Sequence, residues 1–286
     1  MHDAVTYSAS PPGLREYLSP SSMLASIWTH RRVSSAIARR EVEGRYRTHR
    51  LGLFWVLMHP LVMLGVYTFV FGIVFKTKLT LRDDEPLGVY ALAIFTGLLT
   101  FGIFREMATR APTLIVAHRH FVTKMIFPLE SLALSELLAA LFNFAVGMIV
   151  WVVGYVAFIG EMPTWHALLT PLLLVPICLA GLGMSWLLSA LGTFLRDLAS
   201  VVELAVIVLF HMTPIFYSID RIPEPWKSIL MWNPLAHVVQ SVRAVLLEHR
   251  QPDWPWFLGS LATSFLFAVV GYAVFMKSRR AFADVL

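Results

Sequence analysis

Few side chains in this sequence have the type and spacing that chemistry requires. The densest acidic cluster, Asp83-Asp84-Glu85, stands beside Pro86. Carboxylates placed together in this way could act as general acid and general base in a membrane-embedded glycosyltransferase or lipid-modifying enzyme. A charged run next to a proline is also typical of a solvated turn, and we interpret the cluster as such a turn.

Two histidines, His118 and His120, flank Arg119. Imidazole is a common metal ligand, but zinc sites combine three or four ligands at characteristic spacings. The sequence places no cysteine and no further histidine at such a spacing from this pair. We therefore expect a solvated basic face here and no metal site.

Nucleotide-binding and hydrolase motifs are missing from the sequence. It contains no G-x-x-x-x-G-K-[ST] phosphate loop, and none of its lysines follows a glycine. It also lacks the G-x-S-x-G turn that presents a nucleophilic serine. We expect no cofactor in this chain.

Two polar residues stand inside long apolar segments. Glu136 lies about two helical turns into one such segment and Asn143 about two turns deeper. Ionisable residues inside a membrane are costly, so they mark functional sites by default. A series of carboxylates across the whole bilayer, which a proton-coupled transporter would need, is missing from the sequence, and this disfavours proton coupling.

The composition indicates that lipid surrounds much of this protein. Hydrophobic residues make up 57% of the chain and charged residues 14%, whereas soluble domains carry about 25% charged residues. The net charge of +5 is explained by membrane topology, so we expect no nucleic-acid partner. The single cysteine, Cys178, excludes an internal disulfide.

Six apolar segments are long enough, or nearly long enough, to cross a bilayer, which needs about 20 residues of helix. Their residues do not alternate as the strands of an outer-membrane barrel would, so we predict an all-α integral membrane protein. The predicted transmembrane helices are 53–75, 87–104, 132–159, 167–194, 201–217 and 256–276.

The basic residues predict the orientation of these helices. Most lysines and arginines fall in segments 1–52, 105–128, 195–200 and 277–286. Positive charge accumulates on the cytoplasmic side, so both termini are predicted to be cytoplasmic. The first fifty residues lack the apolar core of a signal peptide, and we expect them to be retained.

Two segments outside the spans have unusual patterns. Residues 21–50 mix apolar and basic positions, which predicts an interfacial amphipathic helix between a cytoplasmic tail (1–20) and the transmembrane domain (51–286). Residues 218–255 are predicted to be external, yet they are rich in apolar side chains. We interpret them as two short re-entrant helices, broken at Asn233-Pro234.

Several stretches resemble the permease subunits of ATP-binding-cassette polysaccharide exporters. They are “RREVEGRYRTHRLGLFWVLMHPLVMLGVYTFVFGIVFK”, “MIFPLESLALSELLAALFNF”, “FLRDLASVVELAVIVLFHMTPIFYSIDRIPEPWKSILMWNPL” and “KSRRAFADVL”. The resemblance extends over nearly everything from Arg39 onward. That family exports lipid-linked O-antigen, capsular polysaccharide and teichoic acid across the bacterial inner membrane.

The resemblance implies a transport subunit and not an enzyme. Two permeases would form a homodimer around a continuous pore. Two separate nucleotide-binding subunits would bind ATP and Mg²⁺ and hydrolyse the ATP. The substrate would be a lipid-linked polysaccharide, and periplasmic export proteins are a further expected partner. The six spans, the interfacial helix and the re-entrant pair agree with the family's arrangement.

The resemblance also implies where the ATPase subunits dock. The loop 105–128 would carry a coupling helix whose apolar middle inserts into a groove of the partner, and the turn 195–200 would be a second contact. The implied coupling residues are Arg110, Leu114, Ile115, His118, Arg119, His120, Lys124, Arg196 and Asp197.

A sugar pore and its external gate are the last implied sites. Aromatic rings suit the apolar faces of sugars, although the same residues are also typical of lipid-facing or interfacial positions. The principal candidates for the pore are Tyr67, Phe71, Phe216 and Tyr217; Tyr90, Trp151 and Trp232 are further candidates. An apolar gate would be formed by Ile222, Ile229, Leu230, Trp232 and Val238.

Two other classes of protein remain possible on the sequence. A membrane-embedded enzyme would depend on the acidic cluster at 83–85. A secondary transporter would carry an inverted internal repeat, and we find none. Co-purification with an ATPase subunit would distinguish an exporter from both.

Overall fold

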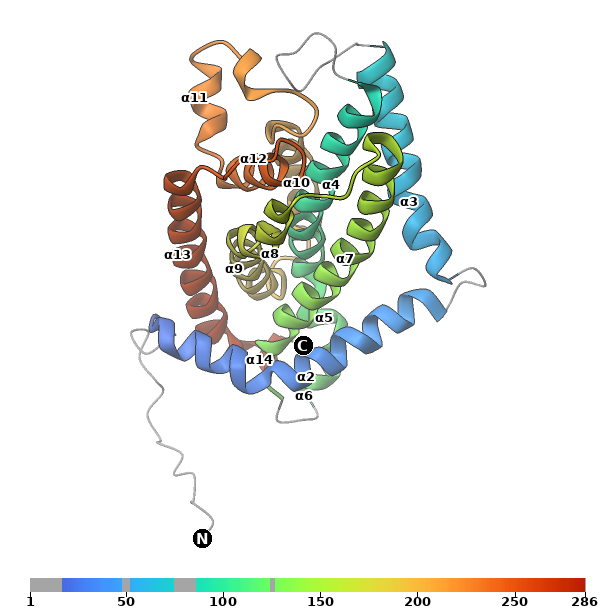
Figure 1. Ribbon diagram of the computed structural model, residues 1–286. Coiled ribbons are helices and arrows are strands. Elements are labelled where there is room, and N and C mark those ends of the chain that lie inside the picture. Colours follow the sequence, from blue (N-terminus) through green and yellow to red (C-terminus); the bar gives the residue numbers. More distant parts are fainter. Residues whose placement is uncertain (1–16, 48–51, 75–85, 124–126, 286) are drawn as a thin grey trace.

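The computed structural model describes residues 17–47, 52–74, 86–123 and 127–285, and all regular structure in these ranges is helical (Figure 1). Four helical segments are long and apolar enough to cross a membrane. They are Leu87–Ala117, Ser131–Ile159, Trp165–Gly192 and Trp254–Val285. The all-α prediction is confirmed for the described residues, together with four of the predicted spans.

The first and fifth predicted spans are shorter or less regular helices. Helix α3 (Gly52–Tyr67) continues into a π-helical turn, η1 (Thr68–Val74). Helix α10 (Leu198–Met212) ends five residues before the predicted boundary at Tyr217. The cause is Pro214, because a residue before proline is displaced from helical geometry and Thr213 is extended, with φ −88° and ψ 131°.

The second predicted span, 87–104, ends too early. Helix α4 covers Leu87–Arg110 and is followed directly by η2 (Ala111–Thr113) and α5 (Leu114–Ala117). The predicted boundary relied on the first charged residues, at Arg105 and Glu106. These charges do not end the helix, because Glu106 accepts a hydrogen bond from Asn143 of the neighbouring helix at 2.8 Å.

The remaining long helices follow the sequence prediction closely. Helix α7 covers Ser131–Ile159 and ends at Gly160, whose φ of 82° favours glycine. The fourth segment consists of η3 (Trp165–Leu169), α8 (Thr170–Leu173) and α9 (Val175–Gly192), with a proline near the start of α8 and of α9. Helix α13 covers Trp254–Ser278.

Helices α9 and α13 approach each other closely through glycine. A Cβ atom added to Gly271 on α13 would lie 2.2 Å from the backbone oxygen of Gly183 on α9. A Cβ on Gly183 would in turn lie 2.8 Å from the Cα of Ala268. Small residues allow membrane helices to pack backbone against backbone where the hydrophobic effect cannot drive association.

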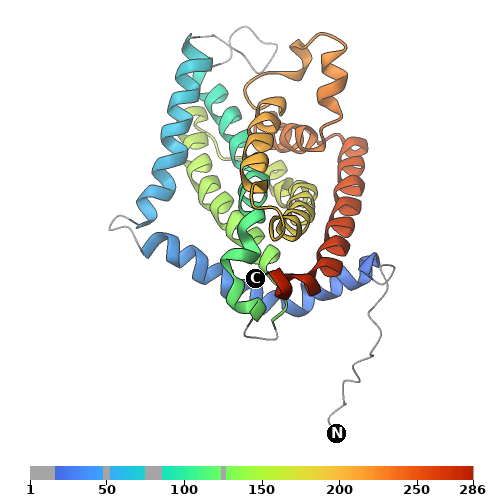
Figure 2. The ribbon, with the colours of Figure 1, turned by 180° about the vertical axis from the view of Figure 1, so that it is seen from behind.

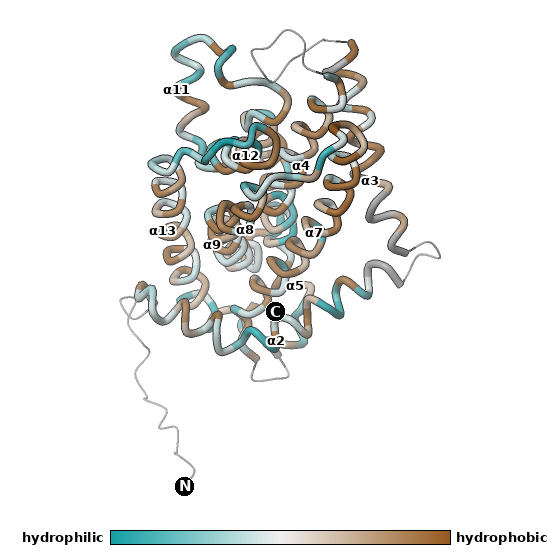
Figure 3. The backbone as a smooth tube through the Cα atoms, viewed as in Figure 1, coloured by the Kyte–Doolittle hydropathy of each residue, from teal (hydrophilic) through white to brown (hydrophobic). Residues whose placement is uncertain are grey.

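Helix α2 (Pro20–Arg47) lies across one end of the bundle, beneath the other helices (Figures 1 and 2). Met23, Ser34 and Ala38 are its buried residues, and the Ser34 hydroxyl donates to the backbone oxygen of Ser131 on α7 at 3.1 Å. Figure 3 shows polar residues along α2 and apolar residues along the bundle above it. Its interfacial location remains a prediction.

The opposite end of the bundle is formed by the segment after α10. It contains η4 (Ile219–Arg221), α11 (Trp226–Met231) and α12 (Pro234–Leu246). Asn233 separates the two short helices: its side chain accepts from the Leu235 amide at 3.0 Å and donates to the Thr213 hydroxyl at 3.1 Å. The predicted break at Asn233-Pro234 is therefore confirmed, and α12 packs against α4, α8 and α13.

Three short helices complete the end of the bundle that α2 covers. They are α6 (Arg119–Thr123), η5 (Arg279–Ala281) and α14 (Phe282–Val285). The described start of the chain and its C-terminal helix thus lie at the same end of the molecule (Figure 1).

The α9–α13 contact predicts a strong position dependence for glycine substitutions on α13. Gly271→Ala should lower the thermal unfolding midpoint of the detergent-purified protein, since overpacking costs about 1–3 kcal/mol. Gly259→Ala on the same helix is the control, because nothing lies within 4 Å of its added Cβ, and alanine favours a helix over glycine. Equal midpoints for the two variants would contradict the close approach.

Candidate functional site

One predicted pore residue, Phe216, belongs to the core of the chain. Its side chain is 4% exposed and its ring lies 4.7 Å from that of Tyr67 and 5.4 Å from that of Phe210. Neighbouring rings of the same chain thus cover Phe216 in this structure, and its role in a pore stays a prediction. Two further candidates, Tyr90 and Trp151, are also buried.

The other aromatic candidates remain predictions. Tyr67 is half-buried against Phe216, and Tyr217 is half-buried with its hydroxyl donating to the His211 backbone oxygen at 3.0 Å. Trp232 is 87% exposed. The side chain of Phe71 lies outside the described residues.

A buried arginine, Arg243 on α12, organises the end of the bundle remote from α2. It is 8% exposed. Its Nε and Nη2 atoms donate to the Ala93 backbone oxygen at 3.3 and 3.2 Å. Nη1 donates to Pro214 at 3.2 Å, and Nη2 also donates to Ile215 at 3.0 Å. One side chain thus connects α12 to α4 and to the break after α10.

The sequence analysis missed Arg243. The sequence feature that could have identified it is a charged residue within the mostly apolar helical segment VVQSVRAVL. Such residues are functional candidates by default. Gly97, one turn along α4 from Ala93, leaves space for the Arg243 side chain. A Cβ atom added to Gly97 would lie 3.2 Å from Nη2 of Arg243 and 3.0 Å from the Ile215 side chain.

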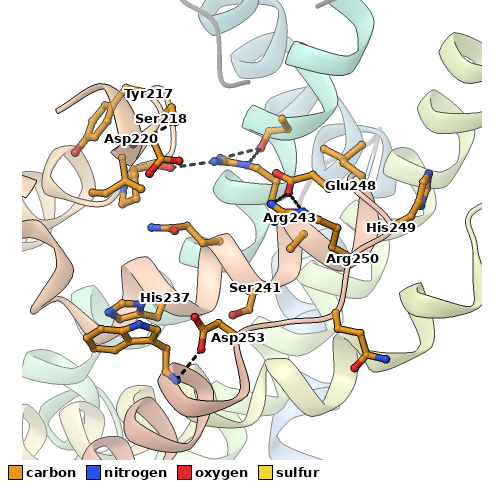
Figure 4. A pocket seen from close by; sticks show the side chains of 18 of the residues that line it. Tyr217, Ser218, Asp220, His237, Ser241, Arg243, Glu248, His249, Arg250 and Asp253 are labelled. Carbon is orange, nitrogen blue, oxygen red and sulfur yellow. Dashed lines mark hydrogen bonds and ion pairs between the residues drawn. The ribbon is translucent and has the colours of Figure 1, made fainter. Parts of the chain in front are cut away.

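A cavity of about 910 Å³ lies beside Arg243, in the range of small-molecule binding sites. Its walls come from the start of α4, the segment after α10, helix α12 and the loop before α13 (Figure 4). Side chains from opposite walls converge on it. Its principal polar and aromatic lining residues are Tyr217, Asp220, His237, Gln240, Ser241 and Trp256.

The predicted gate residues do not form one group. Val238 is 3% exposed on α12, where it packs into the core of the bundle, and its role in the gate stays a prediction. Ile222 and Leu230 are half-buried, and Ile229 and Trp232 are exposed. These four lie around η4 and α11, apart from the face of α12 that packs against α4 and α13. Their gating role stays a prediction.

At the end covered by α2, the predicted coupling anchors are also buried. Leu114 is 4% exposed and Ile115 is 0% exposed, so both are covered by their own chain in this structure, and their coupling role stays a prediction. Both belong to α5, which packs against α9. Backbones meet closely there: a Cβ added to Gly192 would lie 2.0 Å from the backbone oxygen of Pro112. Val116, 43% exposed, is the accessible large apolar residue of this helix.

Arg110 makes ion pairs within the chain. Its Nη1 atom lies 2.6 Å from a carboxylate oxygen of Glu41 on α2 and 3.4 Å from one of Glu136 on α7. Its Nη2 atom lies 3.7 Å from Glu106 on α4. The polar residues that the sequence placed inside the spans, Glu136 and Asn143, therefore belong to a network that connects α2, α4 and α7. Arg110 is the centre of this network, and its coupling role stays a prediction.

The remaining coupling candidates are accessible. Arg119 and His120 are exposed and His118 is half-buried, with its Nδ1 atom 2.9 Å from the Leu114 oxygen. Arg196 and Asp197 are exposed in the turn before α10. Lys124 lies outside the described residues. The described part of the chain contains no group of three or more side chains suited to a metal ion.

These accessible residues share one end of the molecule. Pro112 contacts the end of α9 at Gly192, and Phe194 packs 6.1 Å from the Phe282 ring of α14, which itself contacts α6. We call the exposed side chains of this region the loop patch. It comprises Val116, Arg119, His120, Phe194, Leu195, Arg196 and Asp197.

The burial of α5 predicts different outcomes for neighbouring substitutions. Ile115→Asp should reduce the amount of folded protein in the membrane severely, because an unpaired buried charge is strongly destabilising. Val116→Asp should leave the amount of protein near wild type. Fluorescence-detected gel filtration of detergent extracts measures both, and equal abundance of the two variants would contradict the assignment of Ile115 to the core.

The contacts of Arg243 predict that it holds the break after α10 in place. Arg243→Met should leave three backbone oxygens without this donor, at a cost of about 1–3 kcal/mol for an unsatisfied group, and loosen the segment. A cysteine introduced for the buried Ile219, in a Cys178→Ser background, should then react several-fold faster with a maleimide. The exposed Arg250→Met is the control, and an unchanged rate in Arg243→Met would refute the anchoring role.

Comparison with known proteins places the chain in a family. The profile described as ABC-2 type transporter matches residues 33–247. The chain is 28% identical to the O-antigen export system permease protein RfbA of Klebsiella pneumoniae, over 87% of this chain and 93% of that protein. It is 26% identical to the RfbA of Myxococcus xanthus, over 92% and 98%, respectively. The polysialic acid transport protein KpsM of Escherichia coli is 25% identical over 74% of this chain and 80% of its own length. Because the profile covers most of the sequence, this protein belongs to the ABC-2 type transporter family.

Proposed function

We propose that this chain is the permease subunit of an ATP-driven exporter that moves a lipid-linked polysaccharide across the bacterial inner membrane. The observation that carries the proposal is the extent of the alignment with O-antigen export permeases, which covers more than nine tenths of their length. The apolar helices support the transmembrane location.

The permease would cross the membrane six times. In addition to the four long segments, α3 with η1 contains enough residues, Gly52 to Val74, to span about 30 Å at 1.5 Å per residue. Helix α10 is too short to do so alone, and the segment up to Tyr217 would complete its crossing. The common location of α2 and α14 supports an even number of spans with both termini in the cytoplasm.

Helices α11 and α12 would enter the outer leaflet and return. Irregular backbone is tolerated at membrane depth only where protein or a water-filled cavity satisfies its polar groups. Arg243 donates hydrogen bonds to the backbone oxygens at the break after α10. The Asn233 side chain accepts one from the backbone amide at the start of α12. Ile222, Ile229, Leu230 and Trp232 would contribute an apolar seal at the external mouth.

The pore would form between two copies of the permease. Along α10, Val202, Val206 and Phe210 are buried, and half of the other side chains are exposed and apolar. Either lipid or a second copy of the permease could cover this exposed face. Tyr67, Phe71 and Tyr217 are the aromatic residues proposed to contact sugars in such a pore.

ATP hydrolysis would take place in separate nucleotide-binding subunits that dock on the loop patch. The patch combines exposed apolar residues, Leu195 at 54% and Phe194 at 43%, with basic side chains. It lies beside η2 and α5, which continue directly from α4, so a movement of the partner would reach a spanning helix without a flexible linker. The Arg110 network would then transmit it to α2 and α7. Periplasmic export proteins are a further proposed partner.

A charge reversal in the loop patch tests the coupling role. Arg196→Glu should lower ATP-dependent export and permease-stimulated ATPase activity several-fold, because it reverses a charge at the contact with the partner. The amount of permease in the membrane should stay normal. Arg40→Glu, an exposed arginine on α2, is the matched control.

Measurements on the purified complex distinguish the proposal from its alternatives. Unchanged ATPase stimulation in Arg196→Glu would remove this residue from the docking surface. Export that continues without ATP would favour a secondary transporter. Sugar transfer by the permease alone would favour an enzyme that uses the acidic cluster at 83–85, which lies outside the described residues.

A further inference from the structure

We propose that the cavity beside Arg243 is a saccharide-binding site that takes a neutral, hydroxyl-rich sugar unit of the exported polymer. This inference rests on the proposed export function and adds a substrate class to it. The site is lined by a single permease, between α4, α12 and the loops around them.

The cavity is a product of the fold and is held rigidly. Its walls come from parts of the chain as distant as Ala93 and Trp256. Arg243 fixes three of these walls relative to one another through its hydrogen bonds to Ala93, Pro214 and Ile215. A volume of about 910 Å³ is within the range of pre-formed ligand sites.

Two stacked aromatic rings form one wall of the cavity. The rings of His237 and Trp256 are stacked, with centroids 4.3 Å apart and an interplanar angle of 8°. His237 is in turn held by a contact of 2.6 Å between its Nε2 atom and the Met231 backbone oxygen. Trp256 is nevertheless 48% exposed. A fixed indole with accessible surface suits the apolar C–H face of a pyranose ring.

Hydrogen-bonding groups without protein partners lie next to this wall. The Nε2 atom of Gln240 is buried and has no hydrogen-bond partner among the described residues. A buried donor left unpaired is unfavourable, and a sugar hydroxyl in the cavity could accept from it. Ser241, the next residue on α12, adds a hydroxyl, and Figure 4 shows it on the same side of the cavity as the Asp253 carboxylate.

The charges of the lining favour a neutral ligand over an acidic one. Three described acidic residues, Asp220, Glu248 and Asp253, line the cavity with two arginines, Arg243 and Arg250. Arg250 is paired with Glu248 and Lys227 with Asp220, and Arg243 donates to backbone oxygens. Among the described residues, Asp253 has no ion-pair partner, so a carboxylate-bearing glycan would meet a like charge there, which opposes binding. A neutral glycan would find acceptors for its hydroxyl groups.

Binding of defined oligosaccharides to the purified full-length permease in nanodiscs tests the site. The probes are neutral hexasaccharides of glucose, mannose and galactose, and a hexamer of sialic acid, and the readouts are saturation-transfer NMR and titration calorimetry. At least one neutral hexamer should bind, and the sialic acid hexamer should bind at least tenfold more weakly. Absence of binding by all neutral probes, or tighter binding of the acidic one, overturns the proposal.

Substitutions locate the binding. Trp256→Ala should weaken binding of the neutral probe at least tenfold, and Gln240→Leu, which keeps the bulk of the side chain, should weaken it at least threefold. Trp28→Ala removes an exposed tryptophan on α2 that does not line the cavity and should leave binding unchanged. Thermal unfolding midpoints verify that the variants are folded. Wild-type affinity in a folded Gln240→Leu and a folded Trp256→Ala variant would refute the site.

An export assay in cells separates this inference from the function on which it rests. If ATP-dependent export by the wild-type complex is observed while the cavity binds no neutral sugar, the saccharide site alone is rejected. If the wild-type chain supports no export with any partner ATPase, the proposed function itself is rejected.

Discussion

The central physical constraint on this structure is that backbone polar groups away from water need hydrogen-bond partners. Pro214 ends α10 and leaves the carbonyl groups of residues 214 and 215 outside any helix. Arg243 provides the donors, from a helix that follows later in the chain. The same guanidinium donates to the Ala93 oxygen on α4. The side chain that pairs with the free carbonyl groups after α10 therefore also fixes α12 against the bundle. The cavity beside Arg243 exists because these three elements are held apart and held still.

The two ends of the bundle use polar groups for different purposes. At the end remote from α2, Arg243 binds neutral backbone oxygens and creates a fixed, concave surface. At the other end, Arg110 is shared by carboxylates from three helices, and half-buried pairs of this kind can be exchanged when helices move. Between the two ends, α9 and α13 meet through glycine. The end of the bundle that contains Arg243 is thus held by hydrogen bonds to the backbone, whereas the end that contains Arg110 is held by ion pairs between side chains.

Much of this fold could be predicted from the sequence before the structure was considered. Hydropathy and length identified the four long spans, and the prolines and Asn233 identified the break between α11 and α12. These features depend on local chemistry, namely the length of an apolar segment and the backbone donor that proline lacks. The boundary of α4 was misjudged because a charged residue such as Glu106 was read as the end of a span, whereas pairing across helices makes it acceptable inside one.

The sequence by itself determined that this chain lies in lipid, that it is helical, and which family it resembles. Only the tertiary structure decided the surroundings of each side chain. Hydropathy says that Ile115, Val116 and Phe216 avoid water, but the fold decides that Ile115 and Phe216 are covered by their own chain while Val116 is left accessible. The same holds for Arg243, whose partner Ala93 is distant in the sequence. The physical reason is that lipid, a partner and the chain's own core are equally apolar, so composition cannot distinguish them, and contacts between distant segments are made only by packing.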